Sequence, residues 1–119
     1  MDIFCKIVNG EIPSKKLYED DMVMVIMDVN PSSDGHSLII PKKHYKDLFD
    51  IDKEVLFRIM GVAREMSLKL EEKLDCDGIT LIQNNGISQD VKHFHLHLVP
   101  KYNSNKKSSI EEVFHKIVD

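Results

Sequence analysis

The sequence predicts an α+β fold: a mostly antiparallel five-stranded sheet with one long helix and short terminal helices. Its 119 residues are enough for one hydrophobic core. Apolar residues recur at helical spacing through one long segment, whereas the other apolar runs are short and bounded by turn residues, as strands are. Strands that follow one another along a chain favour antiparallel pairing, with a helix on one face of the sheet.

The first forty residues are expected to form a short helix and three strands. Apolar residues at helical spacing predict a helix over residues 2–8, and Asn9-Gly10 supplies its stop. Apolar runs on either side of an acidic turn predict strands over 15–18 and 22–28. After a loop of Asn, Pro, Ser, Asp and Gly residues, a third strand is predicted over 36–40.

A long helix from about Asp52 to Leu74 is the clearest element. Its apolar stripe has i, i+3, i+4 spacing and consists of Val55, Leu56, Ile59, Met60, Ala63, Met66, Leu70 and Leu74. Asp52 can cap the helix because its carboxylate can accept the free N–H groups of the first turn. Two further strands are predicted, over 79–84 and about 91–101.

The last seventeen residues, 103–119, are predicted to be a polar tail that ends in a short helix. Ser109-Ile110-Glu111-Glu112 fits a capping box. The apolar face of the helix consists of Ile110, Val113, Phe114, Ile117 and Val118. Residues 1–102 are therefore expected to be the main domain, and the amphipathic helix is expected to pack on that domain or on a dimer partner.

Composition and charge exclude several classes of protein. The formal net charge is −4, which argues against a broad nucleic-acid surface. No apolar run approaches the ~20 residues needed to span a bilayer, and the start lacks the apolar segment of a secretory signal. The two cysteines, Cys5 and Cys76, fit a reducing compartment. We therefore expect a cytoplasmic protein that binds neither nucleic acid nor membrane.

The stretch 92–100 carries the functional signal. Because side chains alternate between the faces of a strand, His93, His95 and His97 are expected to line one face of a single strand. The residues between them, which point to the core, are Phe94, Leu96 and Leu98. Imidazole gains nothing from burial beside imidazole, since protonation of one ring opposes protonation of the next. Packing alone does not explain the row, so we expect it to carry chemistry.

Three interpretations of this histidine row are open at this point. It could be a surface strand that is merely rich in histidine. It could be the ligand set of a zinc hydrolase, because His-x-His on a strand offers two zinc ligands and a third histidine could complete an open catalytic site. It could also supply a neutral imidazole that attacks phosphorus, forms a phosphoramidate and releases the product to water.

The pattern His-φ-His-φ-His-φ-φ over 93–99, where φ is apolar, resembles the signature of the histidine triad (HIT) family of nucleotidyl hydrolases and transferases. The resemblance covers about residues 3–102. Its further matching segments are 3–14, 18–21, 28–31, 35–44 and Gln89. Their arrangement resembles that of the small purine-nucleotide phosphoramidases more than that of the dinucleoside polyphosphate hydrolases. The resemblance implies a HIT-like domain over 1–102 and chemistry that needs no cofactor.

The same resemblance implies a homodimer joined through the long helix and the strand that begins at Ile79. It also implies a role for each histidine. His95 would be the nucleophile on the α-phosphorus of a purine nucleotide, AMP- or GMP-type, with its other ring nitrogen bonded to the carbonyl of His93. His97 would contact the phosphate and give a proton to the leaving group, and His36 would support the row from a neighbouring strand.

Other matched positions are implied to bind the nucleotide. Asp28 matches the position that receives the ribose hydroxyls, and a carboxylate can accept from both. Asn84 and Gln89 match polar positions near the phosphate and the leaving group. The positions that match the residues around the base are Ile7, Ile12, Leu17, Tyr18, Ile26 and Val29. Without the resemblance, these apolar residues would be assigned to the core, and Asp28 and Asn84 to turns.

Two positions depart from the family pattern. Asp90 stands where phosphoramidase relatives often carry a serine or threonine that donates to the phosphate. An ionised aspartate cannot donate and would repel a phosphate, so we expect its backbone N–H to replace the contact or its side chain to turn away. The loop from Asn84 to Gln89 is also shorter than in some relatives, which bears on leaving-group selectivity.

A structural zinc is the last implication of the resemblance. Some bacterial relatives pair a Cys-x-x-Cys with the histidine after Pro-Lys-x and the first histidine of the triad. Here Cys5, His44 and His93 match, and Asp2 takes the place of the other cysteine. One cysteine, two histidines and a carboxylate can form a tetrahedral zinc site. The alternative is a buried Cys5 without metal.

For the protein as a whole, two alternatives to a covalent nucleotide hydrolase stay open. One is the zinc-dependent hydrolase that uses the histidine row as ligands. The other is a nucleotide-binding or sensor module with little turnover, because the same residues would bind a nucleotide without rapid chemistry.

Overall fold

The computed structural model describes residues 2–104 and 107–119 and confirms the predicted α+β fold. Within these residues, five strands form one sheet in the order β1-β2-β3-β5-β4, and every pair of neighbours is antiparallel. The strands are β1 Lys16–Glu19, β2 Val23–Met27, β3 Ser37–Pro41, β4 Gly78–Ile82 and β5 Leu96–Lys101. The helices are α1 Ile3–Val8, α2 Lys53–Leu74 and α3 Ile110–Val118, with a short 3₁₀ turn over Gly86–Ser88.

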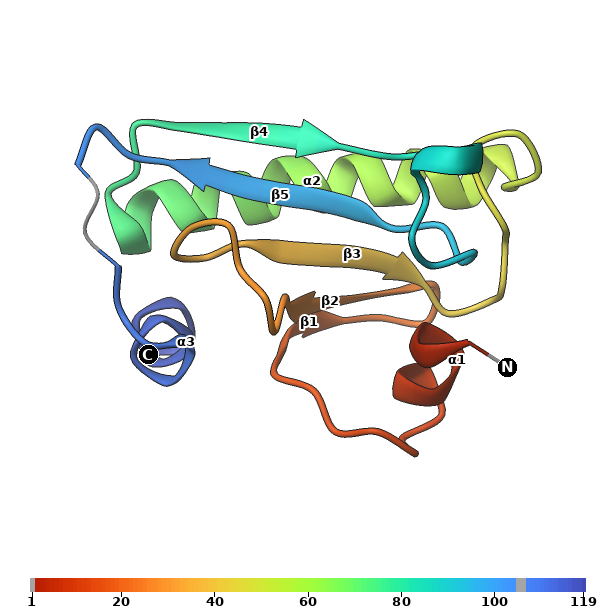
Figure 1. The fold of residues 1–119 in the computed structure, drawn as a ribbon, viewed down its shortest axis with the longest axis horizontal. Helices are drawn as coiled ribbons and strands as arrows, with labels where there is room; N and C mark the ends of the chain where they lie inside the picture. The colour runs from red at the N-terminus through yellow and green to blue at the C-terminus, as the bar shows by residue number, and fades with distance from the viewer. Residues whose placement is uncertain (1, 105–106) are drawn as a thin grey trace.

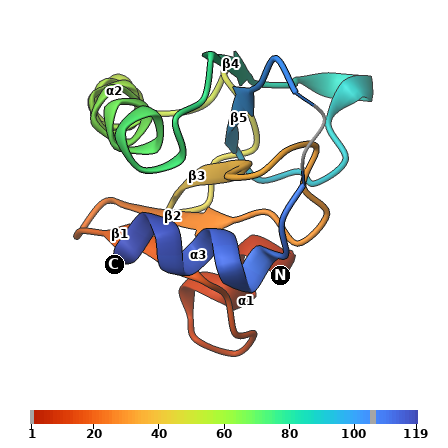
Figure 2. The same ribbon diagram turned by 90° about the vertical axis from the view of Figure 1, so that its left-hand side faces the viewer.

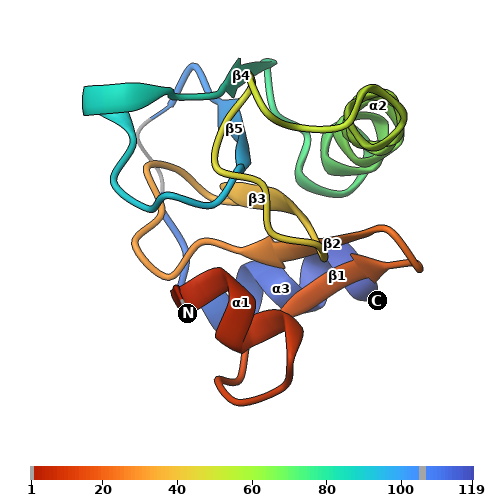
Figure 3. The ribbon, with the colours of Figure 1, turned by 90° about the vertical axis from the view of Figure 1, so that its right-hand side faces the viewer.

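The sheet has a helix on each face, as Figures 1 and 3 show: α2 covers one face and the short α1 the other. Side chains of β2 alternate between two apolar layers, and all five are buried, as expected of a strand covered on both faces. The larger layer, toward α2, includes Val23, Val25, Ile39, Ile59, Leu70, Phe94, Leu96 and Leu98. The smaller layer, toward α1, consists of Phe4, Met24, Ile26, Leu38 and Ile40. This smaller layer lies beside the histidine row.

The long helix α2 begins and packs as predicted. The Asp52 carboxylate accepts the backbone N–H of Glu54 at 2.9 Å, which confirms the predicted cap. The buried positions are Ile59, Val62, Ala63, Met66 and Leu70. Met60, predicted to be part of the apolar stripe, is instead 47% exposed on the flank of the helix. No helix in the described part of the chain is both long and apolar enough to cross a membrane.

The C-terminal helix α3 completes the larger core. Ser109 caps it through the predicted capping box, since its hydroxyl accepts the N–H of Glu112 at 3.1 Å. Val113 and Ile117 are fully buried in the α2-side layer. Figure 2 shows α3 running beside β1 and β2, so the helix packs on its own chain. Residues 105–106 of the predicted tail lie outside the described residues.

The last strand is shorter than predicted, which corrects the setting of the histidine row. β5 begins at Leu96, so His97 belongs to the strand, whereas His93 and His95 precede it. Pairing with β3 stops at Ile39 opposite Leu96. Two residues further, β3 ends at Pro41, which has no N–H to continue the ladder. The expectation of three histidines within one strand was therefore wrong.

Side chains and a loop replace the missing ladder at that point. The Pro41 carbonyl accepts from Nε2 of His93 at 2.9 Å, and the N–H of Phe94 donates to the Tyr45 carbonyl at 2.7 Å. The strand predicted over 79–84 also ends early, at Ile82, so Asn84 lies in the following loop. The end of β3 and the loops that follow β3 and β4 therefore surround the imidazoles.

Candidate active site

The three histidines of the row lie side by side although only one is in β5. The chain before β5 keeps the alternation of a strand, because Phe94 points into the α2-side core while His93 and His95 face α1. The ring centroids of His95 and His97 are 5.0 Å apart, and Phe4 of α1 packs edge-on against His95 at 5.0 Å. His93 and His95 are buried, which limits the rotamers open to them.

Hydrogen bonds determine which nitrogen of His95 carries its proton. Nδ1 lies 2.8 Å from the backbone carbonyl of His93. A carbonyl can only accept, so Nδ1 is the protonated nitrogen. In the neutral ring, Nε2 therefore holds a lone pair, and it points away from this bond. One nucleophilic nitrogen is thus presented at the centre of the row.

A second chain of hydrogen bonds orients His97. The N–H of Ser32 donates to Nδ1 of His36 at 3.0 Å, which makes Nδ1 an acceptor. A neutral His36 then carries its proton on Nε2 and donates it to Nδ1 of His97 at 2.9 Å. His97 in turn keeps a proton on Nε2. Burial lowers the pKa of both His36 and His97, and the His95 ring lowers that of His97 further, so both rings favour the neutral form.

Asp28 joins this pair at the end of β2. Its N–H donates to the carbonyl of His36 at 3.0 Å, and its carboxylate lies 3.4 Å from Nε2 of His36. The donor atoms of Asp28, His36 and His97 lie within 4.8 Å of one another, close enough to surround a metal ion. However, the hydrogen bond from Ser32 leaves the proton of a neutral His36 on Nε2, the nitrogen that would have to bind the ion. That N–H already donates a hydrogen bond to Nδ1 of His97. The donor set suits a hydrogen-bond relay better than the zinc hydrolase alternative.

A second cluster matches the predicted zinc ligands. The Cys5 sulfur lies 3.5 Å from Nδ1 of His44 and 3.4 Å from Nδ1 of His93, and Asp2 lies 3.0 Å and 3.3 Å from the same nitrogens. Tetrahedral zinc with N, O and S ligands requires ligand separations of about 3.3–3.6 Å. His93 donates through Nε2 to Pro41, which leaves its Nδ1 lone pair facing the cluster. Three of the four separations match this geometry, and only the 3.0 Å between Asp2 and His44 is shorter. Burial and Asp2 raise the pKa of the Cys5 thiol, so a bound zinc ion would have to displace its proton.

Gln89 and Asn84, the two polar residues predicted to lie near the phosphate, are both in the loop after β4 but differ in burial. Gln89 is buried, and its amide N–H donates to the Lys46 carbonyl, while its Oε1 has no partner among the described residues. Asn84, five residues earlier in the same loop, is half-buried. Asp90, expected either to turn away or to lend its backbone, places its carboxylate 3.5 Å from Nε2 of His95. The side chain is 82% exposed but does not turn away, and the same carboxylate oxygen accepts the backbone N–H of Val91 at 3.0 Å.

The predicted base-binding residues divide between the two faces of the sheet. Ile7 and Ile26 belong to the apolar layer under α1, next to the imidazoles. Val29 follows Asp28 and is 76% exposed, and Ile12 is half-buried in the loop after α1. The apolar wall also includes Phe4, which the sequence interpretation missed. The signal was available, because Phe4 stands three residues before Ile7 on the same helix face.

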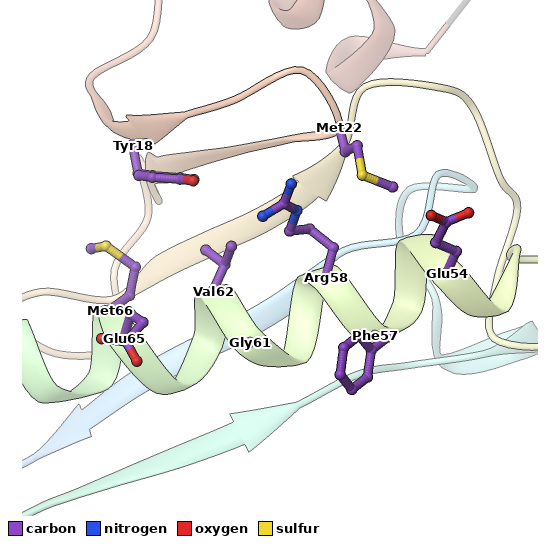
Figure 4. Close-up of a pocket in the computed structure, with 9 residues that line it drawn as sticks. All are labelled: Tyr18, Met22, Glu54, Phe57, Arg58, Gly61, Val62, Glu65 and Met66. Atoms are coloured by element: carbon purple, nitrogen blue, oxygen red, sulfur yellow. The ribbon is translucent and has the colours of Figure 1, made fainter.

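Tyr18 lies on the opposite face of the sheet. It pairs with Val25, and its hydroxyl donates to Asp20 at 2.8 Å. Figure 4 shows Tyr18 at a groove of about 430 Å³ between α2 and the β1–β2 hairpin, with Arg58 and Met66 across from it. Leu17 also packs against the α2-side core. Neither residue contacts the imidazole side, so the prediction that they line the base site does not fit the structure.

A family model of the HIT domain matches residues 9–104. The chain belongs to the HIT family. A HIT-like protein of Methanocaldococcus jannaschii is 44% identical over 105 residues, which cover 86% of this chain and 80% of that one. The adenosine 5′-monophosphoramidase HNT1 of Saccharomyces cerevisiae is 43% identical over 101 residues, covering 83% and 61% of the two chains.

A solved structure agrees with this HIT assignment. The Zn-bound histidine triad family protein of Mycobacterium smegmatis superposes with a TM-score of 0.89 at 35% identity, over 97% of this HIT chain and 88% of that one. The yeast phosphoramidase and the adenylylsulfatase HINT3 of Arabidopsis thaliana, which is 42% identical over 101 residues, are both similar to this chain, so nucleotide hydrolysis is an activity found in the family. The row, the relay and Asp28 thus lie in a HIT fold.

Proposed function

We propose that this protein acts at the α-phosphorus of purine nucleoside phosphoramidates or related nucleotide conjugates through a covalent nucleotidyl-His95. The observation that carries the proposal is the hydrogen bond from Nδ1 of His95 to the carbonyl of His93, because it leaves a lone pair on Nε2. Asp28 is proposed to accept the ribose hydroxyls, and Phe4, Ile7 and Ile26 to form the apolar wall for the base. The proposed chemistry needs no cofactor beyond these side chains and water.

The first step forms a bond from Nε2 of His95 to phosphorus and breaks the bond from phosphorus to the leaving nitrogen. That nitrogen leaves with the bonding electron pair and takes the proton on Nε2 of His97. This leaves His97 as an imidazolate, whose negative charge is offset by the hydrogen bond that Nε2 of His36 donates to its Nδ1 and by the neighbouring His95 ring. Phosphorylation makes the His95 ring cationic, 5.0 Å from His97, which favours loss of that proton. In the second step water attacks phosphorus, the bond to His95 breaks, and a proton from water returns to His97.

A trapped adduct tests the proposal. Adenosine 5′-phosphoramidate is mixed with the protein, quenched in alkali and digested, and the peptide containing His95 is measured by mass spectrometry. We expect a nucleotidyl adduct in the wild type, none in His95→Ala, and an unchanged adduct in the control His115→Ala, which alters an exposed ring on α3. A binding or sensor module would bind AMP in calorimetry yet form no adduct. Loss of turnover on chelation without unfolding would favour the zinc hydrolase.

A structural zinc held by Asp2, Cys5, His44 and His93 is a second proposal, supported by the ligand distances described above and by the zinc-bound relative. A bound ion would tie α1, which carries Phe4 and Ile7, to the loop that precedes β5. We expect about one zinc per chain in protein purified without a polyhistidine tag, and less than about a tenth in Cys5→Ser. Zinc near zero in the wild type would remove the proposal.

Asp2 needs a separate control because it also caps α1. Its carboxylate accepts the N–H of Cys5 at 2.8 Å. Asp2→Asn keeps an N-cap oxygen but removes the charged ligand, whereas Asp2→Cys restores a thiolate. We expect zinc affinity to fall in the first variant and to rise in the second, with the helix retained in both.

A homodimer through β4 and α2 is a third proposal. β4 is an edge strand with an unpaired side, and its Leu81 and Ile82 are 42% and 41% exposed (Figure 1). Arg58 pairs with Asp20, so its side of α2 faces the β1–β2 hairpin. Two residues advance a helix by slightly more than half a turn, so Met60 lies on the opposite side of α2, toward β4. These apolar groups would be covered if two copies paired β4 with β4 and α2 with α2.

Analytical ultracentrifugation tests this interface. We expect a dimer in the wild type and a monomer in Ile82→Lys, since a charge at the paired edge opposes association. Val118→Lys is the matched control, because Val118 is equally exposed but lies on α3. A wild-type monomer, or a dimer that Val118→Lys disrupts and Ile82→Lys does not, would contradict the proposed interface.

A further inference from the structure

The loop 30–35, between Asp28 and His36, donates a hydrogen bond to His36, the first ring of the histidine relay. Its Ser32 N–H is the donor that makes Nδ1 of His36 an acceptor. The position of this loop therefore decides where the proton of His36 lies, and through the His36–His97 bond it decides where the proton of His97 lies. Contacts that hold the loop in position therefore also keep the proton of His97 on Nε2, where the proposed reaction uses it.

The end of β5 and the chain that follows it hold this loop in place. The Ser33 hydroxyl donates to the carbonyl of Pro100, and the Tyr102 hydroxyl donates to the carbonyl of Asp34 at 2.7 Å. The N–H of Ser108 donates to both carboxylate oxygens of Asp34 at 3.0 Å. Three donors thus fix the two residues that directly follow Ser32.

The loop is also closely packed at Gly35, its last residue. Gly35 has a φ of +89°, and a Cβ there would lie 3.1 Å from Cγ of Pro100 and 2.5 Å from Cδ1 of Leu74. The loop is therefore closely packed between the end of α2 and the end of β5. Burial raises the pKa of Tyr102 to about 12, so its hydroxyl remains a donor at any physiological pH.

We propose that Tyr102, with Ser33 and Asp34, forms a clamp that positions the relay: it holds Ser32 against His36 and so keeps the proton of His97 on Nε2. The role in catalysis rests on the proposed function, whereas the tautomers can be measured without turnover. Tyr102 touches neither the reacting atoms nor the imidazoles in this arrangement, so it is a positioning residue. The segment after β5 thus contributes to the site from the far side of the loop.

Histidine ¹⁵N NMR and steady-state kinetics on Tyr102→Phe, Ser33→Ala and their double variant test the clamp. Each single variant removes one neutral hydrogen bond, which changes an equilibrium by about fivefold. We expect kcat to fall about fivefold in each and about 25-fold in the double variant, with KM within about twofold. The ring nitrogens of His36 and His97 should shift from the Nε2–H toward the Nδ1–H tautomer.

Tyr45→Phe is the matched control, because it removes a phenolic oxygen from a half-buried tyrosine whose ring packs on the core and on Lys43. It should leave both tautomers and kcat unchanged. Unchanged tautomers with kcat within twofold in the double variant would overturn the clamp. If the double variant does not fold, the same measurements on the two single variants decide. A wild type without turnover would contradict the proposed function, and the NMR shifts would still test the clamp.

Discussion

Nε2 of His36 lies 2.9 Å from Nδ1 of His97, and this bond connects the loop after Asp28 to the histidine row. It settles the orientation of His97 relative to His95, whose ring centroid is 5.0 Å away. Neighbouring imidazoles therefore differ in what they present: in their neutral forms, Nε2 of His95 carries a lone pair and Nε2 of His97 carries a proton. Adjacent rings with identical protonation could not act as nucleophile and donor in one step.

His97→Ala should lower kcat by about 10²–10⁴-fold for a substrate with an alkylamine leaving group, because the proton donor is lost. The loss should be much smaller for a nitrophenyl ester of AMP, because nitrophenolate leaves as a stable anion without protonation. Steady-state rates with the two substrates measure this difference. An equal loss with both leaving groups would assign His97 to phosphate binding alone.

Asp28→Ala should weaken selection of ribose. A hydroxyl bonded to a carboxylate contributes about 1.5–3 kcal/mol, so the preference of the wild type for AMP over 2′-deoxy-AMP should fall by roughly tenfold or more. Calorimetric binding of both nucleotides measures the ratio. Asp21→Ala, in the exposed turn between β1 and β2, is the control and should keep the wild-type ratio. A ratio that Asp28→Ala leaves unchanged would place the ribose elsewhere.

Stability should decrease as the pH falls from 7.5 to 5.5. Burial lowers the pKa values of His36 and His97 below 6.5, so the unfolded chain takes up protons more readily than the folded one. This contribution is complete above pH 6.5 and is lost as the pH falls through 6.5 toward the folded pKa values. Carboxylates with lowered pKa values, such as Glu19 and Asp50, lose theirs only below about pH 4.5.

Urea unfolding of chelator-treated protein at several pH values measures this dependence without metal release. His36→Gln should flatten the dependence between pH 7.5 and 5.5, while His115→Gln, on the exposed side of α3, should retain it. The same slope in all three proteins would show that the buried relay does not titrate in this range.

Gly35→Ala should destabilise the protein by about 2–4 kcal/mol. The residue has a positive φ, and the new methyl group would collide with the side chain of Leu74. Gly61→Ala is the matched control: nothing lies within 4 Å of a Cβ there, and alanine favours a helix by up to about 1 kcal/mol. Guanidinium unfolding should move the two midpoints in opposite directions. A neutral Gly35→Ala would mean that the loop has room to shift.

Features that depend on neighbours along the chain could be predicted from the sequence. The apolar stripe of α2, its Asp52 cap and the Ser109 cap of α3 all follow from spacing within one or two turns. The alternation of imidazoles and apolar side chains around His95 held for the same reason, even without the ladder, because an extended backbone still alternates its side chains.

Features that depend on distant partners were decided by the tertiary structure. The start of β5 at Leu96 depends on Pro41 of β3, which cannot continue the ladder. A register shift between Lys16 and Tyr18 places Tyr18 opposite Val25, on the α2 side rather than beside the imidazoles. Simple alternation along β1 cannot predict such a bulge, because it arises from pairing with β2.

The site itself divides in the same way. The sequence determined that an imidazole row would stand in a HIT-like chain, since residue types and short spacings define that motif. Only the fold decided the proton positions, because Ser32 and His97 reach His36 from two different segments. The fold also brought Asp2 and His93 within 3.3 Å across ninety-one positions of sequence. Contacts of that separation have no local signature, since they exist only when the sheet and its loops close together.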